Sequence, residues 1–160
     1  MKIVHQRIIN SPMGLLRVEI IEDRLTRLDL MADPEENYRD EHPLLDETER
    51  QICEYFDGKR QEFNLPIHYE GTMFQKEVWA ALGSIPYGAT CSYKDIASKI
   101  KREKAVRAVG QANKRNPLPI VIPCHRVVGK NGSMTGYAGT HINKKELLLN
   151  LESRFSNRNS

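Results

Sequence analysis

Apolar residues recur along the chain at two different spacings. Up to about residue 70, short runs rich in Ile, Leu and Val alternate with turn residues such as Pro, Gly and Asp, which is typical of antiparallel strands joined by tight turns. The elements predicted in this part are strands over 3–10, 15–21 and 25–30, an exposed acidic loop over 33–43 and a helix over 46–56. A further strand is predicted over 63–69, in which Pro66 indicates either a sheet edge or a break. We therefore expect a small antiparallel sheet accompanied by one helix.

From residue 73 onward the apolar positions follow the spacing of amphipathic helices. Phe74, Val78 and Leu82 stand at i, i+4 and i+8, and Ser92 is a good N-cap for a helix that continues through Ile100. The predicted helices cover 73–83, 93–100, 103–114 and the stretch from Asn143 onward. The second and third of these, joined by a tight polar link, suggest a helix-turn-helix, although such pairs are also common in proteins that never touch DNA.

The net charge of the whole chain hides a division. Residues 1–70 carry 9 basic and 16 acidic side chains, a net of −7, whereas residues 71–160 carry 15 basic and 5 acidic ones, a net of +10. The change of sign near Gly71 predicts two domains, 1–70 and 71–160, with different partners. The basic domain is a candidate for binding a polyanion, most often nucleic acid, and the alternative is an ordinary solvated basic surface.

Composition excludes several classes of protein. The mean hydropathy is −0.56 and no apolar run is long enough to span a bilayer. The N-terminal stretch lacks the apolar core of a secretion signal, so a cytoplasmic protein is expected. Three cysteines, Cys53, Cys91 and Cys124, are too few and odd in number for a disulfide framework, and no CxxC pair suggests a zinc site. Cys53, inside a helical pattern, is expected to be a packing residue.

The predicted helix over 103–114 combines small and cationic side chains. Ala105, Ala108, Gly110 and Ala112 would let this helix approach a neighbour closely, and Arg107, Gln111 and Lys114 form a separate stripe at i, i+4 and i+7. One interpretation is close packing against another helix. The other is a helix that presses against a DNA backbone or a shallow minor groove while Arg107 probes between bases.

The candidate chemical centre follows this helix. Three prolines between residues 116 and 123 stiffen an apolar segment that ends at Cys124, beside His125 and Arg126. A cysteine thiol becomes a nucleophile where cations favour the thiolate or an oriented base removes its proton, whereas a buried structural cysteine is the alternative. Glu146 is either a structural cap, because it forms a capping box with Asn143, or the carboxylate that orients an imidazole.

These segments together resemble a known family, the O6-alkylguanine-DNA alkyltransferases or methylated-DNA–protein-cysteine methyltransferases. The resemblance is strong over 70–160, in IPCHRVV, GTMFQKEVWAALGSIPYGAT, SYKDIASKI, RAVGQANKRNPLPIVIPCHRVVGKNGSMTGYAG and KKELLLNLE, and looser in SPMGLLRVEI and YFDGKRQEFNLPI. It implies an α+β fold in which a small N-terminal antiparallel-sheet (RNase H-like) domain precedes a helical helix-turn-helix (winged-helix-like) domain.

The resemblance also implies roles for particular residues. Cys124 would accept the alkyl group, with His125 as base through a bound water and Glu146 orienting it. Asn116 falls on the family's hinge, and Tyr93 would turn a phosphate and give a proton to the leaving guanine. Arg107 would fill the space left by an extruded nucleotide. The DNA-binding residues implied are Tyr93, Ala105, Arg107, Ala108, Gly110, Gln111, Asn113 and Lys114, and those of the base pocket are Val127, Tyr137, Ala138 and Gly139.

The implied activity is transfer of a methyl or other alkyl group from O6-methylguanine, and from O4-methylthymine, to Cys124 in a single irreversible turnover. The partner would be double-stranded DNA bound through its minor groove by a monomer, with no cofactor and no membrane. Thr140 stands where the family usually has a second glycine, and the N-terminal part offers only His5 and His42 as zinc ligands, so no zinc is expected. Two other readings are a non-catalytic module that binds alkylated guanine and a hydrolase using Cys124, His125 and Glu146.

Overall fold

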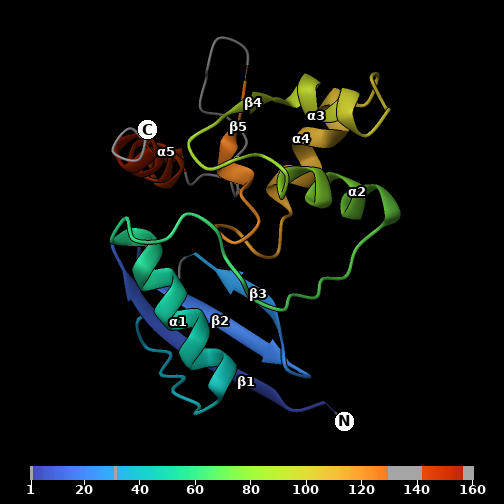
Figure 1. Cartoon of the computed structure of the whole chain (residues 1–160). Coiled ribbons are helices and arrows are strands. Elements are labelled where there is room, and N and C mark those ends of the chain that lie inside the picture. The colour runs from blue at the N-terminus through green and yellow to red at the C-terminus, as the bar shows by residue number, and fades with distance from the viewer. Residues whose placement is uncertain (1, 31, 130–141, 157–160) are drawn as a thin grey trace. The chain divides into compact units, whose positions relative to one another are not determined.

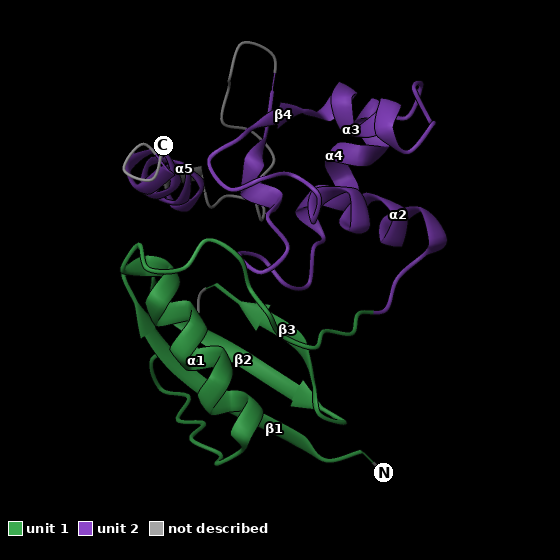
Figure 2. Ribbon diagram, viewed as in Figure 1, with its two compact units in different colours: residues 1–69 green, residues 70–160 purple. Residues whose placement is uncertain are grey.

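The chain forms two compact units. The structure, a computed structural model, describes residues 2–30, 32–129 and 142–156. One unit comprises Met1–Tyr69 and the other Glu70–Ser160 (Figure 2), so the division falls one residue before the expected boundary. No helix in the described part of the chain is both long and apolar enough to cross a membrane.

Unit 1 is built on a three-stranded antiparallel sheet. Its strands are β1 (Val4–Ser11), β2 (Gly14–Ile21) and β3 (Arg24–Asp29), in the order β1-β2-β3. The turn between β2 and β3 places Glu22 and Asp23 at φ of 51° and 60°, which suits a two-residue hairpin loop. Leu16, Val18 and Ile20 alternate along β2 as buried residues. The prediction of three short strands joined by tight turns is therefore confirmed.

One helix, α1 (Pro43–Phe56), covers a face of this sheet (Figure 1). It begins three residues earlier than predicted, because His42 caps it by accepting a hydrogen bond from the backbone N–H of Leu44 and Pro43 occupies the first helical position. Tyr55 is fully buried and Phe56 only partly. Cys53 is exposed, so its expected packing role is wrong.

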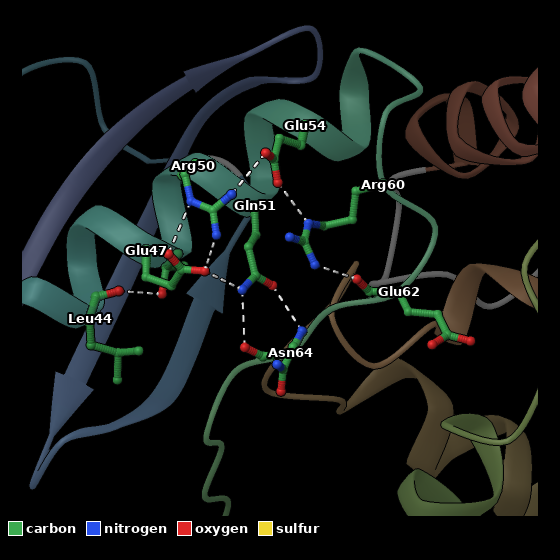
Figure 3. Close-up of polar contacts among 9 residues, drawn as sticks. Leu44, Glu47, Arg50, Gln51, Glu54, Arg60, Glu62 and Asn64 are labelled. Carbon is green, nitrogen blue, oxygen red and sulfur yellow. Dashed lines mark hydrogen bonds and ion pairs between the residues drawn. The ribbon is translucent and has the colours of Figure 1, made fainter.

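The segment after α1 folds back along the helix (Figure 3). Gln51 exchanges hydrogen bonds with the backbone of Asn64, at 3.0 Å to the carbonyl oxygen and 2.9 Å from the N–H, and Arg60 Nε donates to Glu54 Oε1 at 2.9 Å. The strand predicted over 63–69 does not form. Only a single parallel bridge joins Ile67 to Leu25 of β3, since Pro66 has no N–H to continue a ladder.

Unit 2 begins with three helices packed together. They are α2 (Met73–Leu82), α3 (Tyr93–Lys99) and α4 (Val106–Lys114). Thr72 and Ser92 form capping boxes at the first two, whereas α4 starts three residues later than predicted and has no side-chain cap. The indole N–H of Trp79 on α2 donates to the carbonyl oxygen of Ala112 on α4 at 2.9 Å, fixing α2 against the second helix of the helix-turn-helix.

Two short strands and a terminal helix complete unit 2. β4 (Cys91–Ser92) pairs in parallel with β5 (Val127–Val128), which follows the 3₁₀ turn η1 (Cys124–Arg126). The last helix, α5 (Ile142–Ser156), contacts η1. Its buried residues are Lys145, Leu148 and Glu152, whereas Leu147, Leu151 and Phe155 are half-buried.

Candidate active site

The segment before Cys124 is held by one side chain. Asn116 Oδ1 accepts a hydrogen bond from the N–H of Leu118 at 2.9 Å, and its Nδ2 donates to the carbonyl oxygen of Ile122 at 2.8 Å. Between them Ile120 has a φ of 76°, which is rare for a β-branched residue and persists only where the surroundings enforce it. Asn116 therefore acts as a brace within unit 2, and it fixes the backbone that leads to Cys124.

Cys124 is buried, with 1% of its surface exposed. Burial raises the pKa of its thiol to about 12, although the Asn116 side chain and the positive charge of Lys145 act in the opposite direction. Of the two routes to a nucleophilic thiol that the sequence left open, cations do not suffice here, because removal of water outweighs them. A base must take the proton before the sulfur can act as a nucleophile.

His125 is the nearest base in the sequence, and its partner is Glu152. The ring Nε2 lies 2.6 Å from Glu152 Oε2, and both side chains are buried. Glu146, the predicted orienting carboxylate, is exposed. That prediction is wrong, because residue 146 lies on a different face of α5 from 145, 148 and 152. Glu152 carried a sequence signal nonetheless, since it stands four residues after the buried Leu148.

The shared hydrogen bond sets the protonation of both groups. Burial alone would raise the pKa of Glu152, but hydrogen bonds from His125 and Arg126 outweigh burial and lower this pKa to about 2. Burial lowers the pKa of His125 despite the carboxylate beside it. A neutral His125 that donates its Nε2 proton to the ionised Glu152 leaves Nδ1 as the basic nitrogen. The pair can therefore receive a proton from a thiol.

Lys145 is a buried cation that sequence reasoning missed. Its ammonium donates to the carbonyl oxygen of Val127 at 2.5 Å and lies 6.0 Å from the centre of the Tyr93 ring. Burial lowers the pKa of Lys145 to about 8. Tyr93 begins α3 directly after β4, and the pairing of β4 with β5 brings it toward Val127, which is fully buried. Because the Lys145 charge also acts on the Cys124 thiol, Lys145 links Tyr93 and Cys124 in one part of the site.

The predicted DNA-binding residues of α4 divide by burial. Arg107, Ala108, Gln111 and Lys114 are exposed, whereas Ala105 and Gly110 are half-buried, with Gly110 beside the Tyr93 ring. Asn113 is fully buried and donates to the carbonyl oxygen of Cys124 at 3.4 Å, so its assignment as a DNA contact is wrong. The physical reason is the helical period, since residue 113 lies one turn after the buried Val109.

The predicted pocket residues Tyr137, Ala138 and Gly139, together with Thr140, lie outside the described residues. The two histidines considered as zinc ligands, His5 and His42, have their ring centres 4.7 Å apart. Among the residues that the structure describes, no three His, Cys, Asp or Glu side chains are arranged to hold a metal ion.

Known proteins combine the same elements in the same order. The model for the ribonuclease-like domain of 6-O-methylguanine DNA methyltransferase matches residues 4–69, and the model for its DNA-binding domain matches 73–154. The constitutive methylated-DNA–protein-cysteine methyltransferase of Bacillus subtilis is 49% identical over 89% of this chain and 91% of its own length. A crystal structure of Mycobacterium tuberculosis OGT in complex with DNA superposes with a TM-score of 0.85 and 41% identity, covering 94% of each chain.

A helix-turn-helix unit that matches a known DNA-binding domain and carries a buried cysteine beside a histidine–glutamate pair defines a DNA-binding protein with a candidate nucleophile. The family models cover both units, and the relatives match nearly the whole chain. The chain belongs to the methylated-DNA–protein-cysteine methyltransferase family, and it is a methyltransferase of DNA repair.

Proposed function

We propose that this protein repairs O6-alkylguanine in double-stranded DNA by moving the alkyl group to Cys124. The observation that carries the proposal is the buried Cys124 thiol next to the His125–Glu152 hydrogen bond of 2.6 Å. A site that binds a lesion without reacting needs no nucleophile and no base beside it. The exposed Arg107, Gln111 and Lys114 of α4 supply a surface for the nucleic acid.

The reaction balances without an added reagent. The Cys124 proton passes through a water to Nδ1 of His125, and the resulting thiolate sulfur forms a bond to the methyl carbon as the bond from that carbon to O6 breaks. The hydroxyl of Tyr93 gives its proton to the departing guanine, and the proton gained by His125 then restores the Tyr93 hydroxyl. One thiol and one O6-methylguanine become one thioether and one guanine, and no cofactor is consumed.

Access to a base inside a duplex requires the nucleotide to leave the stack. Extrusion costs a few kcal/mol, which binding of α4 in the minor groove would offset. Arg107 projects from the exposed face of α4 and would occupy the vacated space. O4-methylthymine presents a similar alkyl ether and is expected to react as well.

The thioether formed on Cys124 has no leaving group that water displaces readily. We therefore expect one turnover per molecule. All the groups used by the reaction come from one chain, which suits a monomer. Three free cysteines, of which Cys124 must stay reduced to react, suit the reducing cytoplasm.

The decisive experiment follows the methyl group. A duplex that carries O6-methylguanine with a labelled methyl is incubated with the protein, which is then digested and mapped by mass spectrometry. We expect the label on the peptide that contains Cys124, saturating at one equivalent, and none on the Cys124→Ala variant. Tight binding of the lesion without transfer would instead favour a lesion-binding module, and repeated ester hydrolysis that depends on Cys124 would favour a hydrolase.

A further inference from the structure

Arg126, the residue next to the candidate base, donates a hydrogen bond from each of its three guanidinium nitrogens inside unit 2. Its Nε donates to Glu152 Oε1 at 2.8 Å, its Nη2 to Glu152 Oε2 at 3.0 Å, and its Nη1 to the carbonyl oxygen of Ile85 at 2.6 Å. The guanidinium also lies 5.6 Å from the centre of the Tyr87 ring. Arg126 is buried, so it is neither a surface cation nor a contact for the DNA backbone.

The carboxylate of Glu152 is shared among three donor groups: an imidazole, a guanidinium and a backbone N–H. Oε2 accepts from both His125 Nε2 and Arg126 Nη2, and Oε1 accepts from Arg126 and, at 3.3 Å, from the N–H of Gly88. Arg126 is always charged and already balances the single negative charge of Glu152. A proton on both nitrogens of His125 would therefore be a surplus charge in a buried site.

Without Arg126, the preferred protonation state of His125 would be different. A buried carboxylate whose only partner is an imidazole is balanced best when the imidazole is protonated, because the two then form an ion pair. His125 in that state has no free lone pair, and it cannot accept the Cys124 proton. The charged groups that act on His125 are Glu152 and Lys145 from α5 and Arg126 beside it in the chain, with Cys124 on its other side. Tyr87, from the turn after α2, lies against Arg126 and near Glu152.

We propose that Arg126 is a positioning residue that holds Glu152 ionised and His125 neutral, so that the resting site keeps a base ready for the Cys124 proton. A test of this inference by the rate of methyl transfer rests on the proposed function, whereas a test by NMR of the His125 ring does not. The same contacts also fix the orientation of the carboxylate, because both its oxygens are held.

The direct test is the protonation state of His125 in the wild-type protein. Histidine labelled with ¹⁵N is followed by NMR from pH 5.5 to 8, and the His125 signals are assigned by their loss in His125→Gln. We expect a neutral ring with its proton on Nε2 through most of this range. An imidazolium at pH 7 in the wild type would overturn the proposal, whether or not any variant folds.

Two variants then separate charge from packing. In Arg126→Met the cation is lost and the aliphatic bulk is kept, so we expect His125 to titrate at a pH higher by about one unit or more. The single-turnover rate, measured with O6-methylguanine free base, rises with pH, and this rise should shift to higher pH by a similar amount. Arg126→Lys keeps the charge and should recover most of the wild-type profile.

The outcomes are distinguishable from failure of the proposed function. If the wild type transfers no methyl group, the function fails while the NMR result stands. If Arg126→Met transfers more slowly by the same factor at every pH, with an unchanged His125 titration, Arg126 is only a structural residue and the inference fails.

Discussion

Burial acts in the same direction on Cys124 and Glu152, yet the two side chains rest in opposite protonation states. Removal of water raises the pKa of the thiol to about 12, so Cys124 keeps its proton. The same effect on Glu152 is overcome by hydrogen bonds from His125 and Arg126, and the carboxylate stays ionised with a pKa of about 2. Sequence neighbours indicated the cysteine and the histidine, but only the fold reveals which carboxylate reaches the histidine.

The pair Glu152 and Glu146 provides a matched test on one helix. Glu152→Gln keeps the shape of the side chain but removes the charge that stabilises a protonated His125, so the single-turnover rate on O6-methylguanine DNA should fall by about a hundredfold or more. Glu146→Gln alters an exposed residue and should change the rate by less than about twofold. Rapid-quench kinetics on both variants would decide, and equal losses would contradict the assignment of Glu152.

At the scale of elements, patterns along the chain predicted most helices and strands, since each depends on local spacing and turn residues. The failures occurred where one residue interrupts a pattern or where a distant contact decides. The segment 63–69 has strand-like composition, yet Pro66 limits it to one bridge with Leu25. On α5 the buried stripe contains Lys145 and Glu152 because polar partners in the site receive them. Apolar spacing alone therefore does not identify the buried stripe of α5.

Replacing glycine by alanine is expected to have opposite effects on stability at two positions, Gly88 and Gly110. Gly88 has a φ of 81°, and a Cβ there would lie 2.7 Å from Ser156 Oγ on α5, so Gly88→Ala should destabilise the protein by about 1–2 kcal/mol. Gly110 lies within α4, and a Cβ would meet only the Tyr93 ring at 3.9 Å. Gly110→Ala should therefore stabilise the protein by about 0.5–1 kcal/mol. Urea unfolding measures both, and destabilisation by Gly110→Ala would mean that α4 does not tolerate the methyl group.

The exposed face of α4 supports a separate prediction for Arg107. Arg107→Ala should lower the rate of repair of duplex DNA by about tenfold or more, because the vacated stack is no longer filled. Reaction with O6-methylguanine free base should remain within about twofold of wild type, since no stack is opened. Lys114→Ala is the control for simple loss of positive charge. Equal loss with the duplex and the free base would refute a role for Arg107 in extrusion.

Across the whole molecule, the excess of positive charge and the candidate site lie in the same part of the chain. Residues 1–70 carry a net charge of −7 and residues 71–160 carry +10, and every group of the candidate site lies in unit 2. The charge division and the approximate boundary were visible in the sequence, because they need only counting. The protonation states of the site were not visible in the sequence, because they depend on which side chains the fold buries next to one another.

Acid should weaken the fold in two stages. His125 has a lowered pKa in the folded protein, so the unfolded chain gains this proton first and stability is lost as the pH falls below about 6.5, the ordinary value. Glu152 has an ordinary value of 4.5 and a folded pKa of about 2, so further stability is lost between these values.

Urea midpoints measured from pH 7 to pH 3 would follow both stages. Glu152→Gln lacks the second group and should show a shallower decline at the acid end. A decline of equal steepness in that variant would place the acid sensitivity in other carboxylates.

Trp79 is the only tryptophan in the chain, and its indole N–H is bonded to the backbone of α4. The emission of a buried indole responds to the polarity around it and to its hydrogen bond. The intrinsic fluorescence of the protein therefore reports on the packing of the helix proposed to meet DNA, and a change in emission on addition of duplex would follow the docking of α4 in real time without any attached dye.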